Sequence, residues 1–266
     1  FHTVKSRVIA FKNGFHGRTS AAVAATDNPK INAPINQQQK VNFLPFNDLE
    51  AFQKEIKKGD VCAVILEAIQ GVGGLEEPSV EFFQKIAKLT KENGALLIAD
   101  EVQCGFGRSG KFFGFQHHNI NPDIISIAKG MGNGFPVGGV LIHESIEASY
   151  GMLGTTFGGN HLACAATTAV LEVLESENLI ENAAEIGTYF KEKAKEISQI
   201  KDIKGKGLML GIEFDFEVGE LRKKMIYNQH IFTGGAMNKK LLRFLPALNC
   251  TKEHIDLFFN ALKEEL

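Results

Sequence analysis

The sequence predicts an α/β fold, with a doubly wound, mostly parallel sheet in a large domain and a smaller α+β domain after it. Short apolar runs alternate with helical patterns over the first part of the chain. The alternation stops after Asn160, where two long amphipathic patterns follow each other directly. The length of 266 residues is enough for a large and a small domain.

Five short apolar runs are expected to form buried parallel strands, because strands covered on both faces contain few polar residues. They are residues 8–11, 61–67, 95–101, 124–128 and 138–142. Between two of them, residues 80–93 have apolar side chains at helical spacing and end in Asn93-Gly94, a frequent helix stop. The order of strand, helix and strand predicts parallel pairing.

The rest of the chain is expected to be mostly helical, with a small sheet. We predict helices at residues 162–175, 179–197, 218–228 and 252–266, a glycine-rich strand at 205–214, and a short strand pair around 231–232 and 241–245. We place the domain boundary within the first of these helices. Residues 1–175 then form the large domain and residues 176–266 the small one.

Composition and charge exclude several classes of partner. The net charge of −2 gives the chain no electrostatic reason to bind nucleic acid or an anionic membrane. No apolar run approaches the ~20 residues of a membrane span, and no signal peptide is visible. The four cysteines form no CxxC pair, so we expect reduced thiols, a cytoplasmic location and no metal site. The chain starts at Phe1 and enters an apolar run almost at once, and we expect that an N-terminal segment is missing from it.

Two predicted strands end in charged residues, at the edge where open α/β sheets bind ligands. Asp100-Glu101 ends one strand before a glycine-rich turn that contains Arg108, and Lys129 ends the next strand. A lysine in a dry crevice can form an imine with a carbonyl cofactor, because desolvation lowers the pKa of its amine. The alternatives are a structural ion pair with Arg108 and a solvated lysine at the start of a loop.

Two other glycine-containing segments precede predicted helices. Thr155-Thr156-Phe157-Gly158-Gly159-Asn160 offers hydroxyl groups and amides to a phosphate, or only a cap to the helix. Asn13-Gly14-Phe15-His16-Gly17-Arg18-Thr19 offers a ring for stacking and a guanidinium for a carboxylate, or only a turn before a helix at 20–25.

Taken together, these segments indicate a cofactor with a basic ring nitrogen, an aldehyde and a phosphate. Asp100 would pair with the protonated ring nitrogen, and Lys129 would hold the aldehyde and later move a proton. Phe15 would stack on the ring, and Thr156 would hold the phosphate.

Six motifs, by their order and spacing, resemble the class III, fold-type I pyridoxal-phosphate-dependent aminotransferases, and among them the acetylornithine or succinylornithine branch. The motifs are Phe15-His16-Gly17-Arg18-Thr19, Glu67-Ala68-Ile69-Gln70-Gly71, Asp100-Glu101-Val102-Gln103, Ala128-Lys129-Gly130, Thr155-Thr156-Phe157-Gly158-Gly159-Asn160 and Arg243-Phe244-Leu245-Pro246. The resemblance covers essentially the whole chain. It implies a homodimer with a shared active site.

The resemblance also implies a role for each cofactor residue. Lys129 matches the catalytic Schiff-base lysine, Asp100 the partner of the pyridinium, Gln103 the residue that binds the ring hydroxyl, and Phe15 the stacking aromatic. Val102 belongs to the same implied cofactor site. Thr156 matches the phosphate ligand that reaches in from the neighbouring subunit.

For the substrates, the resemblance implies binding by Arg18, Arg243 and Glu67. Arg18 matches the arginine for the distal carboxylate of the ornithine substrate, and Arg243 the one for the α-carboxylate of 2-oxoglutarate or glutamate. The implied reaction transfers the δ-amine of N-acetyl- or N-succinylornithine to 2-oxoglutarate, in arginine biosynthesis. Val72 stands where the family commonly has a glutamate that masks the second arginine. We therefore expect Arg243 to stay open to substrate or to pair with another carboxylate.

Two other interpretations remain open. Ornithine δ-aminotransferases and aminotransferases of 4-aminobutyrate or other ω-amino acids share most of these motifs. A non-catalytic phosphate- or nucleotide-binding domain would use the glycine clusters differently, but no GxGxxG follows the first strand and no Walker sequence is present.

Overall fold

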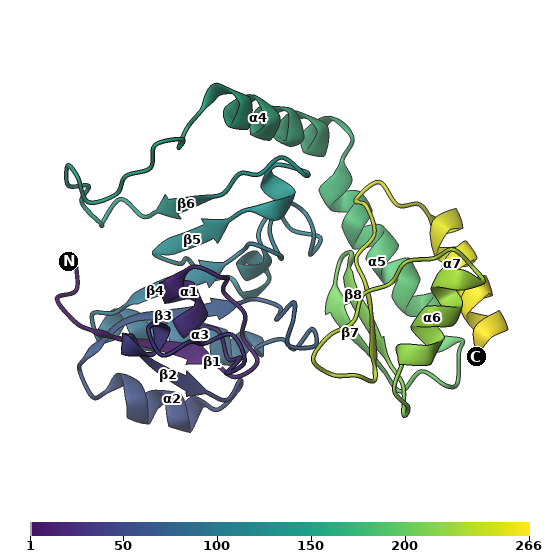
Figure 1. The fold of residues 1–266 in the computed structure, drawn as a ribbon, viewed down its shortest axis with the longest axis horizontal. Helices are drawn as coiled ribbons and strands as arrows, with labels where there is room; N and C mark the ends of the chain where they lie inside the picture. Colours follow the sequence, from purple (N-terminus) through teal and green to yellow (C-terminus); the bar gives the residue numbers. More distant parts are fainter. Residues whose placement is uncertain (1) are drawn as a thin grey trace.

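The computed structural model describes residues 2–266, which form two lobes joined by long helices (Figure 1). The larger lobe has a six-stranded sheet with the strand order β2-β1-β3-β4-β5-β6. Its strands are β1 (Arg7–Phe11), β2 (Lys40–Leu44), β3 (Val61–Glu67), β4 (Leu96–Asp100), β5 (Ile124–Ile127) and β6 (Gly139–Ile142). All neighbouring pairs from β2 to β5 are parallel, which confirms the predicted mostly parallel α/β sheet.

The sixth strand differs from the prediction of a buried parallel strand. β6 runs antiparallel to β5, and all four of its residues are exposed. Only residues 128–138 connect the two strands, which is too short for the helical crossover that parallel pairing needs. The parallel prediction for residues 138–142 was therefore wrong.

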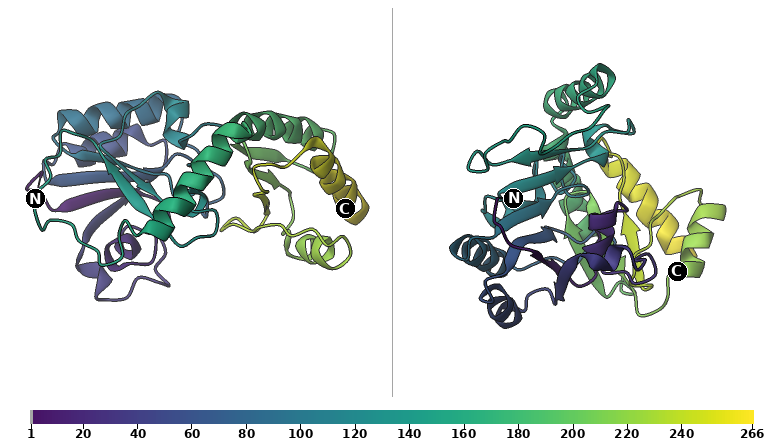
Figure 2. Two further views of the ribbon diagram at one scale, coloured as in Figure 1. Left: turned by 90° about the horizontal axis from the view of Figure 1, so that it is seen from above. Right: turned by 60° about the vertical axis from the view of Figure 1, so that its left-hand side comes forward.

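Helices cover both faces of the large sheet. They are α1 (Ser20–Ala24), α2 (Leu49–Ile56), α3 (Val80–Glu92) and α4 (His161–Ser176), with short 3₁₀ turns η1 (Asn36–Gln38), η2 (Gly114–His118) and η3 (Lys129–Met131). α2 and α3 lie on one face and α1 on the other (Figure 2). The side chains of Ser79 and Asn160 cap α3 and α4, accepting hydrogen bonds from the amides of Phe82 and Ala163 at 3.1 and 2.9 Å.

The smaller lobe contains an antiparallel sheet of three strands, ordered β7-β8-β9. Its elements are α5 (Leu179–Lys195), β7 (Asp202–Lys206), β8 (Met209–Glu213), α6 (Gly219–Tyr227), β9 (Leu241–Phe244) and α7 (Lys252–Glu265). The single strand predicted at 205–214 is wrong, because Gly207, with φ +54°, turns the chain between β7 and β8. The strand predicted around residues 231–232 is also wrong. Only a single bridge, between Gly234 and Arg243, pairs that region with β9.

The two lobes meet through close backbone packing. A Cβ at Gly207, in the turn between β7 and β8, would overlap backbone atoms of Ser109 and Gly110 in the larger lobe. Arg108 donates hydrogen bonds to the carbonyl oxygens of Leu208 and Pro246 at 3.2 and 2.5 Å, and its own carbonyl accepts from the amide of Leu208. The predicted boundary near residue 175 falls at the end of α4, and it remains a prediction. No helix among residues 2–266 is long and apolar enough to cross a membrane.

Candidate active site

Three neighbouring strands bring candidate side chains to one edge of the large sheet. β3 ends at Glu67 and β4 at Asp100, and these two residues are register partners. β5 runs parallel to β4, and Lys129 follows its last residue by two positions. The side chains predicted from separate stretches of sequence therefore lie together at the carboxyl ends of parallel strands.

Asp100 is held by a buried hydrogen bond from His16. Oδ2 of Asp100 lies 2.7 Å from Nδ1 of His16, and the two side chains are 5% and 2% exposed. Oδ1 accepts the amide of Val102 at 3.1 Å. A buried carboxylate is costly without such partners. These two hydrogen bonds hold the Asp100 carboxylate in one orientation. A carboxylate in this position suits a cationic ring nitrogen.

Glu67 is buried and supports the backbone on two sides. Its Oε1 accepts the amide of Phe15 at 3.0 Å, and its Oε2 accepts the amide of Gly71 at 2.9 Å. Burial raises the pKa of this carboxyl, while the neighbouring His16 and the two amides oppose the rise. Glu67 therefore fixes the backbone of the two segments that contain Phe15 and Gly71. Direct contact with substrate, expected from the family resemblance, remains a prediction.

Lys129 stands in a backbone conformation that few side chains adopt. Its φ is +47°, in the left-handed region, directly after the extended residue Ala128. The residue is exposed at the mouth of the site, but partial desolvation lowers the pKa of its amine, and the charge of Arg243 lowers it further. Asp100 and Glu67 oppose this effect. A lower pKa leaves more of the amine uncharged and nucleophilic at neutral pH.

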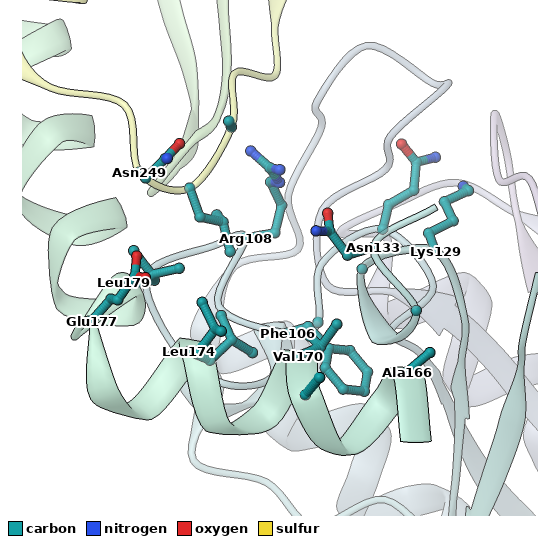
Figure 3. Close-up of a pocket in the computed structure, with 18 of the residues that line it drawn as sticks. Phe106, Arg108, Lys129, Asn133, Ala166, Val170, Leu174, Glu177, Leu179 and Asn249 are labelled. Carbon is teal, nitrogen blue, oxygen red and sulfur yellow. The ribbon is translucent and has the colours of Figure 1, made fainter. Parts of the chain in front are cut away.

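A cavity of about 710 Å³ opens beside Lys129. Figure 3 shows Arg108, Asn133 and Lys129 along its upper side, and Ala166, Val170 and Leu174 of α4 along its lower side. Val102 and Gln103 also line it, and their contact with a cofactor remains a prediction. The side chain of Gln103 packs so closely on Gly71 that a Cβ there would overlap it.

Phe15 and Arg18 come from the loop between β1 and α1. Phe15 is half-buried, and Arg18 is exposed with its Cζ 5.9 Å from the centroid of the Phe15 ring. Arg18 has no carboxylate within 4.0 Å among the described residues. Its guanidinium is therefore available to a carboxylate that approaches the ring of Phe15.

Arg243 reaches the same region from the small lobe. Its Nη1 donates a hydrogen bond to the carbonyl oxygen of Gly71, the residue before Val72. No carboxylate pairs with it in the part of the chain that the structure describes, so the predicted alternative of another carboxylate partner is not met. Burial lowers the pKa of Arg243, as does the charge of Arg222.

Thr156 is the predicted cofactor residue that does not lie with the others. It is exposed, in the segment that connects β6 with α4. Because β6 is antiparallel to β5, this segment leaves the sheet at the amino-terminal end of β5, whereas Lys129 follows its carboxyl end (Figure 1). Within one chain, Thr156 therefore does not contribute to the site built around Lys129.

The structure also revises two expectations about charged residues. The ion pair considered between the strand-end carboxylates and Arg108 is wrong, because Arg108 binds backbone carbonyls and Glu101 binds the amides of Gly114 and Phe115. The bond from His16 to Asp100 was not anticipated, although the position of His16 next to Phe15 was a signal for it. Within residues 2–266, no three His, Cys, Asp or Glu side chains are grouped as metal ligands.

Comparison with known proteins identifies the family. The model of the class-III aminotransferases matches residues 2–266. The chain belongs to the class-III aminotransferases. This aminotransferase is 42% identical to the acetylornithine aminotransferase of Aquifex aeolicus over 98% of its own length and 69% of the relative's. It is 40% identical to that of Bacillus subtilis, over 99% of its own length and 70% of the relative's.

Solved structures agree with this family. The ornithine aminotransferase of Toxoplasma gondii superposes on 98% of this aminotransferase with a TM-score of 0.90 and 26% identity, covering 65% of that chain. An S-selective transaminase from Arthrobacter gives a TM-score of 0.89 at 27% identity, over 99% of this chain and 70% of the other. The aminotransferase thus spans roughly two thirds of the length of the proteins it matches.

Pyridoxal phosphate is the cofactor that this family implies, and the residues present fit its ring. The buried carboxylate of Asp100 suits a pyridinium nitrogen, and the amine of Lys129 opens on the cavity with a lowered pKa. Phe15 offers an aromatic face in the same neighbourhood, since its amide is bound by Glu67 at the adjacent strand end. The donor set therefore matches an aldehyde-bearing, basic heterocycle.

Proposed function

We propose that this aminotransferase transfers the δ-amine of N-acetyl- or N-succinylornithine to 2-oxoglutarate, giving a semialdehyde and glutamate in arginine biosynthesis. The observation that carries the proposal is the placement of the Lys129 amine and the Asp100 carboxylate at neighbouring strand ends, where desolvation lowers the pKa of Lys129. The names of the relatives, acetylornithine aminotransferases at 40 to 42% identity, support the acylornithine as donor.

Each residue of the site has a defined task in this reaction. Pyridoxal phosphate, when bound, supplies an electron sink for the carbon that carries the amine. Asp100, held in place by its hydrogen bond with His16, would stabilise positive charge on the ring nitrogen. Nζ of Lys129 would hold the aldehyde of the cofactor, and as a free amine it would accept the proton from the substrate carbon. The cavity beside this amine has a wall of apolar side chains from α4.

Two arginines suit the two substrates. Arg18, exposed beside Phe15, is placed to bind the distal carboxylate of the acylornithine. Arg243 is placed to bind a carboxylate of 2-oxoglutarate, and Val72 leaves it without the internal carboxylate that commonly masks this arginine in the family. Because a guanidinium can hold a carboxylate through two parallel hydrogen bonds, this pair selects acidic substrates.

A homodimer with a shared site is part of the same proposal. Thr156 leaves the sheet at the edge opposite Lys129, so it serves the phosphate only from a neighbouring subunit. Large apolar side chains are exposed on β6 and α4 and on the segment between them, and they suit a subunit interface. They include Leu141, Ile142, Phe157, Leu162 and Leu171. The free cysteines are consistent with the cytoplasmic location that we propose.

The proposal is tested by spectroscopy and then by substrate. The protein is mixed with pyridoxal phosphate, and its visible absorption is recorded before and after borohydride, together with Lys129→Ala and the exposed control Lys111→Ala. We expect a visible band in the wild type and the control, none in Lys129→Ala, and a borohydride-fixed mass increase on the peptide that contains Lys129. Glutamate formation from 2-oxoglutarate is then measured with acetylornithine, succinylornithine and ornithine. Turnover of ornithine alone would reject the acylornithine assignment.

A further inference from the structure

Two arginines of the small lobe lie against consecutive glycines. Arg243 pairs with Gly234 through two backbone hydrogen bonds of 2.8 and 2.9 Å, and a Cβ at Gly234 would lie 3.2 Å from its Nε. Arg222, on α6, approaches the next residue, where a Cβ at Gly235 would lie 3.0 Å from its Nη1. The absence of side chains at these two glycines lets both guanidinium groups reach the same segment.

Neither guanidinium is matched by an acid in the described part of the chain. Nη2 of Arg222 donates to the carbonyl oxygen of Thr233 at 3.0 Å, and Nη1 of Arg243 donates to that of Gly71. Nε of each arginine and Oγ1 of Thr233 are buried without a hydrogen-bond partner. Three such atoms in one cluster are unusual, because most buried polar atoms in folded proteins are paired.

The charges are also uncompensated. Arg222 is close enough to lower the pKa of Arg243, an effect second only to burial, and only Glu67 acts in the opposite direction. Both oxygens of Glu67 already accept backbone amides, so it gives Arg243 no direct hydrogen bond. Two half-buried cations without a counter-ion repel each other, and an anion bound between them would remove that cost.

The guanidinium groups keep donors for such an anion. Nη2 of Arg243 and Nη1 of Arg222 make no hydrogen bond within residues 2–266. Neither of these two nitrogen atoms is fully buried. Two free donors on neighbouring arginines can bind the two oxygens of one carboxylate.

We propose that Arg222 is a second arginine of the Arg243 subsite, and that the pair binds one carboxylate of 2-oxoglutarate or glutamate. This inference rests on the proposed function, since it adds a binding residue to the acceptor site.

The test measures binding of glutarate, a dicarboxylate that has no keto group and cannot react. Isothermal titration compares the cofactor-loaded wild type with Arg222→Gln and with Lys223→Gln, a control that removes the same charge from the next residue of α6. Lys223 is exposed, and its one ion pair within residues 2–266 is with Glu220. We expect the Kd for glutarate to rise roughly tenfold to a hundredfold in Arg222→Gln and to stay unchanged in the control. An unchanged Kd in Arg222→Gln overturns the proposal.

A second variant covers the case in which Arg222→Gln does not fold. Arg222→Lys keeps the charge but loses the forked donors, so the Kd should rise severalfold, and equal affinity for glutarate overturns the proposal. Failure of the proposed function would look different. Glutarate binding that depends on Arg222 without turnover of acylornithine would reject the function alone. Turnover with a KM for 2-oxoglutarate that is unchanged in both variants would reject the role of Arg222 alone.

Discussion

Replacement of Glu101 by glutamine tests how the structure holds the strand end beside Asp100. Glu101 is 1% exposed, and its two oxygens accept the amides of Gly114 and Phe115 at 2.7 and 2.9 Å. Burial raises the pKa of this carboxyl to about 7 from its ordinary 4.5, even though the two amides favour the charged form. The difference corresponds to about 3 kcal/mol, because one pKa unit is about 1.4 kcal/mol.

The sign of the effect follows from proton binding. The folded protein keeps the proton on Glu101 up to about pH 7, whereas the unfolded chain releases it near pH 4.5. Unfolding in this window therefore releases a proton, and the free energy of unfolding falls as the pH rises from about 4.5 to about 7. Glu101→Gln does not titrate, so this part of the pH dependence disappears in the variant.

The assay is urea unfolding followed by circular dichroism at pH 5, 6, 7 and 8. The free energy of unfolding of the wild type minus that of Glu101→Gln should fall by about 2.5 kcal/mol from about pH 5 to about pH 8. The absolute offset also includes the hydrogen bond that an amide cannot accept, so only the change with pH is diagnostic. Glu172→Gln, at an exposed position of α4, is the control and should run parallel to the wild type. Parallel curves for Glu101→Gln would refute the reasoning.

Three further predictions concern separate parts of the molecule. His16→Phe leaves Asp100 without its buried partner and should lower the free energy of unfolding by about 3 kcal/mol, measured in urea at pH 7; a loss below about 1 kcal/mol would contradict this. Val72→Glu places a carboxylate next to the carbonyl that Arg243 binds, and should raise the KM for 2-oxoglutarate roughly tenfold, whereas Val72→Gln should not. Gly187→Ala should cost about 1–3 kcal/mol in thermal unfolding because a Cβ meets Gly207, while Gly219→Ala, with open space around it, should cost almost nothing.

Much of the large lobe could be predicted because its strands are short apolar runs between helical patterns. The grouping of Glu67, Asp100 and Lys129 followed from one physical rule, since parallel strands bring their carboxyl ends to the same edge. The direction of β6 was mispredicted because an apolar run is equally compatible with either direction. The connection between β5 and β6 is too short for a crossover helix, and its length indicates antiparallel pairing.

Other features depend on contacts between distant segments. β2 pairs at the edge of the sheet and is only partly buried, so Lys40–Leu44 lacks the continuous apolar character of the inner strands. The bond between His16 and Asp100 joins residues 84 positions apart. Arg222 resembles any solvated helix arginine in the sequence, and only the position of Gly235 against its guanidinium distinguishes it.

The left-handed backbone of Lys129 has a consequence for evolution and engineering. A side chain in this region costs about 1–2 kcal/mol relative to glycine, which adopts it freely. The chain therefore gives up conformational stability at the one position that the chemistry cannot vary. A search for more stable variants that ignored activity would tend to select glycine at position 129. Such a variant would be more stable and would lack the catalytic amine.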